Sequence, residues 1–299
     1  MSEKKFELTK RKKRWAQQFK PEGAARGVAL NHPTALEIRY TKGVQRILNA
    51  VIKETQKEVR EIFTTPDATG YFAEDASFTS IANKALDALF KRLGARTQIE
   101  AEKLARSMVK DANKASQASM AGSLKELSGG VTLKPSEMGG DIAEILASSI
   151  EANAGLIVDI TATYQAKVSD AVNRSIQSGR GLADLIPFMR DQTGVTKRHG
   201  KNVALDQTRK AFTHLNVARM ENVGLTKFEW VHSGGGQRPR KYHQDRWPAG
   251  LNGGIFDIND PPFIDPPGEK TRERGLPADA IFCKCRMKPV LVFDEETAA

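Results

Sequence analysis

Four residues in the last quarter of the chain have side chains that could bind a metal ion together. They are His232, His243, Cys283 and Cys285, and these cysteines are the only two in the 299 residues. Thiolate and imidazole groups are the ligands that a tetrahedral Zn²⁺ ion prefers. Because a metal can stabilise a small, loop-rich domain, a zinc site is one hypothesis for this stretch.

The spacing of these residues favours a simpler interpretation. A single residue separates the cysteines, which is tighter than the usual spacing of zinc ligands, and both histidines lie far upstream. In an extended strand, Cys283 and Cys285 would point to one face with Lys284 opposite, as small core residues do. We therefore expect buried structural thiols, with no bound metal and no cofactor. The Cys-x-Cys pair also gives no disulfide framework, which indicates a reducing compartment.

A second chemical hypothesis is a metal-dependent, nuclease-like enzyme that processes DNA. It would use His243 with Asp245, and His232, as metal ligands or as the general base. The partner expected in a His-metal finger is missing at a recognisable spacing, and no cluster of carboxylates suits Mg²⁺. The simpler interpretation is that His243 and Arg240 make hydrogen bonds that hold the long loop. Walker A, dinucleotide-binding and Gly-x-Ser-x-Gly motifs are also absent, so we do not expect an enzyme.

The positive charge of the chain is concentrated at its beginning. The formal net charge is +10, and residues 1–20 contain eight lysines or arginines against Glu3 and Glu7. Such an arm is attracted to polyanions because its binding releases counterions. The candidate nucleic-acid-binding residues are Lys10, Arg11, Lys12, Lys13 and Arg14. No run of 18 apolar residues suggests a membrane span, and the charged start lacks the apolar region of a secretory signal.

Hydrophobic periodicity predicts long amphipathic helices after this arm. The predicted helices cover residues 36–63, about 77–128, 141–178, 182–192 and 201–223. A basic turn at 196–200 would separate the last two. The Ala/Ser-rich run 113–123 is poor in large apolar groups, which indicates close packing or contact with a partner.

The period of the pattern changes after Gly224. Residues 226–232 alternate Phe228, Trp230 and His232 against polar neighbours, which predicts a strand, and residues 281–292 form a second strand-like run. Turn residues dominate the sequence between them. The predicted fold class is a mainly α N-terminal region of long amphipathic helices, followed by a small α+β, loop-rich C-terminal module.

An ordered set of short signals in this module resembles a known family. A helix that contains Arg209 leads to Phe-Glu-Trp-Val-His, then to Arg-Pro-Arg-Lys-Tyr-His, and finally to Phe-Cys-Lys-Cys-Arg. This succession, over roughly residues 165–290, resembles the MuF-type head-morphogenesis domain of minor head proteins of tailed bacteriophages. The resemblance gives a structural role in the family motif to Arg209, Trp230, Arg240, His243, Cys283, Cys285 and Arg286.

The resemblance implies a structural component of the virion. Proteins of this family occur in small copy number in the procapsid, associate with the portal vertex, and contact or accompany the packaged DNA. The implied partners are the portal protein, double-stranded DNA, and the scaffolding or major capsid protein, with an oligomer around the portal ring and no membrane. The implied location is the capsid interior or portal vertex, and the host cytoplasm during assembly. The alternatives are the metal-dependent enzyme and a stand-alone DNA-binding protein.

The resemblance also suggests domain boundaries. We expect a basic N-terminal arm at 1–30, a helical region at 31–164, the MuF-like domain at 165–290 and an acidic tail at 291–299.

Overall fold

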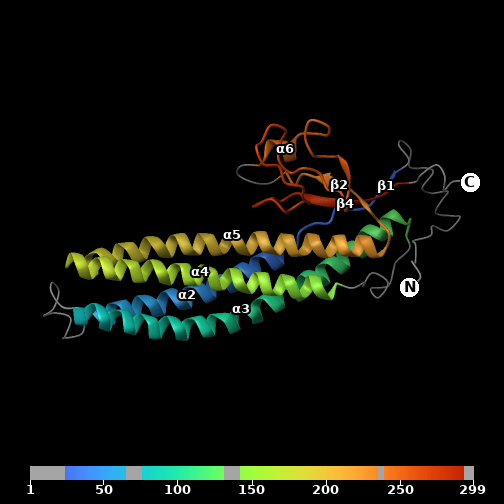
Figure 1. Cartoon of the computed structure of the whole chain (residues 1–299). Helices are drawn as coiled ribbons and strands as arrows, with labels where there is room; N and C mark the ends of the chain where they lie inside the picture. The colour runs from blue at the N-terminus through green and yellow to red at the C-terminus, as the bar shows by residue number, and fades with distance from the viewer. Residues whose placement is uncertain (1–23, 65–75, 131–141, 235–238, 293–299) are drawn as a thin grey trace, which may run out of the picture. The chain divides into compact units, whose positions relative to one another are not determined.

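The computed structural model describes residues 24–64, 76–130, 142–234 and 239–292. The helices in this part of the chain are α2 (Thr34–Thr64), α3 (Ala76–Leu127), α4 (Ala143–Ser178), α5 (Leu182–Asn222) and the short α6 (Lys241–Gln244). The strands are β1 (Ala24–Arg26), β2 (Lys227–Val231), β3 (Ile255–Asp257) and β4 (Arg286–Val292). Long helices followed by a small α+β region confirm the predicted fold class (Figure 1). The basic residues Lys10–Arg14 lie outside the described residues.

The chain divides into two compact units that differ from the predicted domains. The helical unit comprises Glu37–Met108 and Ser148–Leu205. The sheet unit comprises Met1–Leu36, Val109–Ala147 and Asp206–Ala299. The sheet unit therefore includes the last part of α3, and it includes residues 24–30, which the sequence analysis assigned to the arm.

Hydrogen bonds from uncharged side chains of α2 join it to α4 and α5 within the helical unit. Tyr40 on α2 donates a hydrogen bond of 3.0 Å to Asn153 on α4. Gln45 and Gln56, also on α2, bond to the Lys197 carbonyl and the Thr193 hydroxyl of α5 at 2.6 and 3.1 Å. Burial of Tyr40 raises the pKa of its hydroxyl. These bonds fix which faces of the amphipathic helices meet in the core.

The predicted break at 196–200 is wrong, because α5 continues through it as one helix. The prediction rests on the basic, glycine-containing sequence Thr-Lys-Arg-His-Gly, which is typical of a turn. In the structure, Gly200 lies against α2, where a Cβ would come within 2.4 Å of Leu48 Cδ1. Close packing of this glycine favours the helix by more than its low intrinsic propensity disfavours it.

Helix α4 is long and apolar enough, by length and composition alone, to cross a membrane. The core helix of a globular protein meets the same criteria. Within the helical unit, α4 buries an apolar stripe together with polar groups such as Asn153 and Gln165. The apolar character of α4 is therefore accounted for in part by packing inside this unit.

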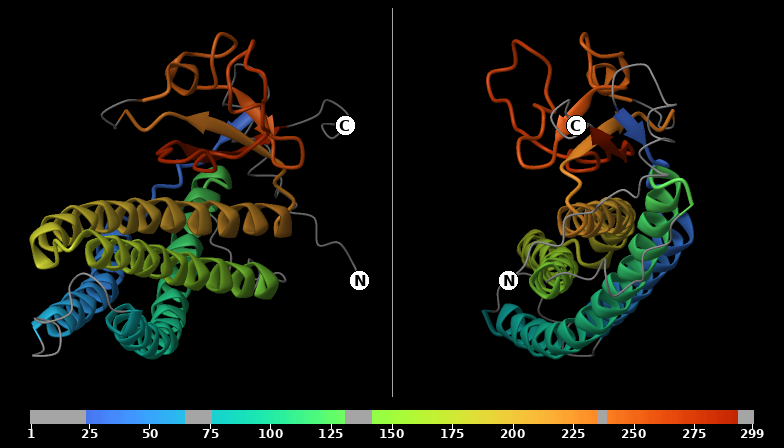
Figure 2. Two further views of the ribbon diagram at one scale, coloured as in Figure 1. Left: turned by 60° about the vertical axis from the view of Figure 1, so that its left-hand side comes forward. Right: turned by 90° about the vertical axis from the view of Figure 1, so that its right-hand side faces the viewer.

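The sheet unit is built on an antiparallel sheet with strand order β1-β4-β2-β3. Strand β4 pairs with β2 through Trp230 opposite Met287, and with β1 through Ala25 opposite Leu291. Figure 2 shows β1 and β4, from near the two ends of the chain, side by side. In β2, Phe228 and Trp230 are buried and their neighbours are partly exposed, which confirms the predicted alternation.

The apolar core of the sheet unit joins the sheet to α3 and α5. Met120 and Leu124 of α3 and Phe212 of α5 pack in one cluster with Phe228 and Trp230. The Ala/Ser-rich run predicted to pack closely lies here. Its small residues Ser116 and Ser123 are fully buried. The close helix packing suggested by this run is thus used within the chain.

A buried arginine joins α3 and α5 inside the same unit. Arg219 donates hydrogen bonds to Ser116 Oγ at 2.9 Å, to the Leu215 carbonyl at 3.1 Å and to Asn113 Oδ1. Ser116 in turn donates to Asn216 Oδ1 at 2.8 Å. Burial lowers the pKa of the Arg219 guanidinium, because low polarity disfavours its charged form. The network fixes the relative rotation of the two helices that support the sheet.

Two glycines in the helical unit provide a matched test of helix packing. At Gly94 on α3, a Cβ would meet nothing within 4 Å. At Gly43 on α2, it would lie 2.5 Å from Leu104 Cδ1. We expect Gly94→Ala to raise the free energy of unfolding by about 0.5–1 kcal/mol. Gly43→Ala should lose that gain, because Leu104 must move. Equal gains in chemical denaturation would contradict this close approach of α2 and α3.

Candidate metal centre

Strand β2 brings His232 to the end of the sheet. Trp230 is fully buried, and His232 follows two residues later on the same face of the alternating pattern. The His232 backbone N–H donates to Asn252 Oδ1 at 3.0 Å, and residues 252–254 return beside the strand through a bond from Trp230 N–H to the Gly254 carbonyl. These bonds hold the backbone of His232 after the strand has ended.

The short helix α6 positions the second histidine, His243, which is buried. Its ring lies edge-on to Trp230, with centroids 5.1 Å apart. Its Nε2 is 2.8 Å from the Ile264 carbonyl oxygen. Because a carbonyl only accepts hydrogen bonds, Nε2 carries the proton and, in the neutral ring, Nδ1 has a free lone pair.

A turn before β4 holds both cysteines. Cys283 N–H donates to the Ala280 carbonyl at 2.9 Å, and Phe282 has a positive φ of 61°. Cys285 N–H donates to Cys283 Sγ at 3.4 Å. The strand-like pattern predicts a strand from residue 281, but β4 begins only at Arg286. The strand begins late because these amide groups bond within the turn and to sulfur. Both thiols are buried, as predicted.

The turn brings the sulfur atoms to the histidines. Nδ1 of His243 lies 3.5 Å from Cys283 Sγ and 3.7 Å from Cys285 Sγ. The ligand atoms of His243, Cys283 and Cys285 all lie within 4.8 Å of one another. Nδ1 of His232 lies 3.6 Å from Cys285 Sγ. All four residues named as the zinc alternative are therefore neighbours.

The electrostatics of the thiol pair favour one thiolate. The pKa of the Cys283 thiol is lowered to about 4, chiefly by the hydrogen bond from Cys285 and also by His243, against the effect of burial. The same hydrogen bond raises the pKa of Cys285. The Trp230 indole N–H and the Ser233 backbone N–H lower the pKa of Cys285, but by less than the other effects raise it. Polar hydrogens thus face both sulfur atoms.

The other residues singled out by the sequence hold the frame around this cluster. Arg240 donates to the Ile281 carbonyl at 3.0 Å, so the prediction that Arg240 and His243 hold the long loop is confirmed. Arg286 bonds to Asn31 Oδ1, which ties β4 to the chain before α2. Arg209 is buried on α5. Asp245, named in the nuclease hypothesis, does not belong to the group of ligand atoms among the described residues.

Sequence reasoning missed two residues that support the site. Asp206, buried near the middle of α5, accepts a hydrogen bond from Phe282 N–H at 3.0 Å and pairs with Lys210 at 3.0 Å. Asn252 supports the backbone of His232. Asp206 looked like an ordinary polar residue of a helix, and Asn252 like a turn residue before two glycines, so no signal distinguished them.

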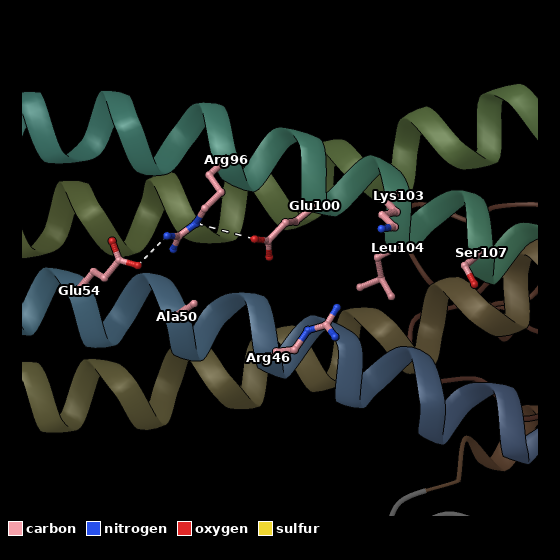
Figure 3. A pocket seen from close by; sticks show the side chains of 8 residues that line it. All are labelled: Arg46, Ala50, Glu54, Arg96, Glu100, Lys103, Leu104 and Ser107. Atoms are coloured by element: carbon pink, nitrogen blue, oxygen red, sulfur yellow. Dashed lines mark ion pairs between the residues drawn. The ribbon is translucent and has the colours of Figure 1, made fainter.

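The helical unit contains a separate groove of about 660 Å³ between α2 and α3 (Figure 3). Arg96 reaches from α3 to Glu54 on α2 at 2.6 Å, and it also faces Glu100 at 3.8 Å. Arg46 and Lys103 supply further positive charge to the lining. The two carboxylates offset most of this positive charge. The charged side chains of the lining form ion pairs that join and support α2 and α3, which favours a structural role over a catalytic site.

The contact between Asp206 and the cysteine turn can be tested directly. Asp206→Ala leaves Phe282 N–H without its acceptor and Lys210 without its carboxylate. We expect a loss of about 1–3 kcal/mol in the free energy of unfolding, because the abandoned donor remains partly buried. Asp206→Asn keeps an acceptor and should lose less. If both variants unfold like the wild type in chemical denaturation, the contact does not support the turn.

Comparison with known proteins gives one relative. The chain is 26% identical over 292 residues to an uncharacterised protein of Haemophilus influenzae, and the match covers 97% of this chain and 59% of the relative. The chain thus spans less than two thirds of the length of that relative. No family model matches the chain, and no solved structure matches it. The similarity extends over both the helical unit and the sheet unit.

Proposed function

We propose that the chain is a head-morphogenesis protein of a tailed bacteriophage, a minor head protein that associates with the portal vertex and contacts packaged DNA. The observation that carries the proposal is the arrangement of the seven residues on which the family resemblance rests. They are spread from Arg209 to Arg286, and the sheet unit contains all of them. Within this unit, His243 contacts Trp230, Cys283 and Cys285, so the short signals meet in space and not only in order along the chain.

The contacts of these residues are structural, as a motif of an assembly protein requires. Trp230 and His243 pack edge-on in the core, and Arg240 and His243 donate to backbone carbonyls of the long loop. Arg286 ties the sheet to the segment before α2. In each case the side chain holds backbone that has little regular secondary structure of its own. The motif therefore specifies the shape of a loop-rich surface.

This surface exposes large apolar side chains. Ile281 and Phe282, in the turn before β4, are 60% and 55% exposed, and Trp247 is 54% exposed. Exposed apolar residues that are held by a rigid frame are suited to protein contact. We place the contact with the portal ring at the pair Ile281 and Phe282. The basic arm, with Lys10–Arg14, would contact DNA through its positive charge.

Association with the portal is the first test. The full chain is purified together with the portal protein encoded in the same genome. We expect it to bind the portal ring, and we expect Phe282→Asp to weaken that binding by about tenfold or more, the effect of losing one central apolar contact. Aspartate tolerates the positive φ of Phe282, so the fold should persist.

A matched control comes from the helical unit. Ile186 on α5 is 45% exposed, and Ile186→Asp should leave portal binding unchanged. Equal weakening by both variants would contradict the placement of the contact. Failure of the wild-type chain to bind the portal ring would contradict the proposed function.

DNA binding is the second test. Replacing the five cations of the arm by glutamine should reduce the slope of log K against log salt by up to about 4.5, because each phosphate contact contributes about 0.9. The control removes five charges from exposed positions of the helical unit. These positions are Lys53, Arg60, Lys84, Lys91 and Arg106. Fluorescence titration of a DNA duplex at several salt concentrations measures both slopes. An equal change in the two variants would contradict a specific role for the arm.

A further inference from the structure

The ligand atoms of His243, Cys283 and Cys285 are close enough to share a tetrahedral ion, and His232 Nδ1 lies beside Cys285 Sγ. A zinc ion bonds to sulfur at about 2.3 Å and to imidazole nitrogen at about 2.0 Å, which separates the two ligand atoms by about 3.5 Å. Three histidine Nδ1 to cysteine Sγ distances, two from His243 and one from His232, are 3.5, 3.7 and 3.6 Å. These separations match those of ligand atoms that share one zinc ion.

The orientation of His243 is that of a metal ligand. Its Nε2–H is donated to the Ile264 carbonyl, so the Nδ1 lone pair is directed at the two sulfur atoms. Metal-binding histidines almost always donate their other ring N–H to a carbonyl or carboxylate in this way. The edge-on contact with Trp230 fixes the plane of the ring as well. The hydrogen bond and the ring contact together fix the orientation of the imidazole.

The charge of the cluster also suits a divalent ion that prefers sulfur and nitrogen ligands. Two thiolates and two neutral imidazoles would balance the charge of Zn²⁺, so the buried centre would carry no net charge. The group of ligand atoms in the described residues contains no carboxylate, which disfavours Mg²⁺ and Ca²⁺. The backbone N–H of Cys285 donates to Cys283 Sγ, as expected beside a sulfur that bears negative charge.

The ligands come from three segments of the loop-rich part of the sheet unit. His232 follows β2, His243 belongs to α6, and the cysteines precede β4. Between β3 and β4, the regular secondary structure of the described chain is limited to the isolated β-bridge between Phe263 and Arg274. We propose that His232, His243, Cys283 and Cys285 bind one zinc ion, which is structural and ties these three segments together. This revises the expectation of metal-free thiols, which rested on the sequence spacing.

Metal content and thiol chemistry test the proposal in the full chain. Reduced protein purified with zinc should contain about one zinc per chain, as a closed structural site holds. Because the chain has only two cysteines, modification of two thiols per chain should release all of the zinc. Exchange for Co²⁺ should give the absorption of a tetrahedral centre with thiolate ligands. Apoprotein that binds neither added Zn²⁺ nor added Co²⁺ would overturn the proposal.

Substitutions test the individual ligands. Cys283→Ser, Cys285→Ser and His243→Ala should each lose stoichiometric zinc. Loss of a residue that only hydrogen-bonds to a metal ligand typically weakens metal binding by about 10- to 100-fold. His232→Ala should weaken zinc binding by more than this. His199, an exposed histidine on α5, is the control, and His199→Ala should bind zinc like the wild type. Unchanged binding in His232→Ala would overturn its assignment as the fourth ligand.

A measurement on the wild-type chain avoids the risk that variants fail to fold. Chelation should lower the thermal midpoint of the wild type, and added Zn²⁺ should restore it, because the ion binds the folded state. Tryptophan fluorescence, to which Trp230 beside the His243 ring contributes, follows the titration as a second signal. A zinc-loaded protein whose midpoint is unaffected by chelation that removes the ion would overturn the structural role. These readouts are independent of portal binding.

Discussion

The loop-rich part of the sheet unit depends on the position of one histidine ring. His243 donates from Nε2 to the Ile264 carbonyl, packs edge-on against Trp230 and presents Nδ1 to both cysteines. One side chain thereby connects α6, the long loop, the buried strand β2 and the turn before β4. Segments with so few backbone ladder bonds require such side-chain links, because their own secondary structure cannot fix them.

The helices supply the surface on which this arrangement is built. The ends of α3 and α5 that belong to the sheet unit contribute Met120, Leu124 and Phe212 to the core beneath the sheet. Arg219 and its partners on α3 set how those helix ends meet. Asp206 extends the same support to the cysteine turn. An assembly protein can use such a rigid base to present loops, and the exposed pair Ile281 and Phe282 follows from this geometry.

The helices and β2 were predictable because each has a strong periodic pattern with a buried face. The continuity of α5 was not, because the packing of Gly200 against Leu48 is a tertiary contact with no local signal. The start of β4 was misplaced for a similar reason. The amides before Arg286 bond within the turn and to the Cys283 sulfur, and alternation alone cannot distinguish that turn from a strand.

The candidate site shows the same limit of local patterns. The residue types suggested zinc, but the long separation along the chain argued against it. The fold removes that objection by returning the cysteine turn to the end of β2 and to α6. The separation of ligands along the sequence indicates their distance in space only when they belong to the same helix, strand or turn. Here they are joined by a sheet whose strands come from distant parts of the chain.

The central claim is that two sulfur and two nitrogen atoms of this chain surround one zinc ion. X-ray absorption at the zinc edge of the full-length, reduced protein tests it most directly. The account predicts two sulfur ligands at about 2.3 Å and two nitrogen ligands at about 2.0 Å. A shell of only nitrogen and oxygen ligands, or one without a second sulfur, would contradict it.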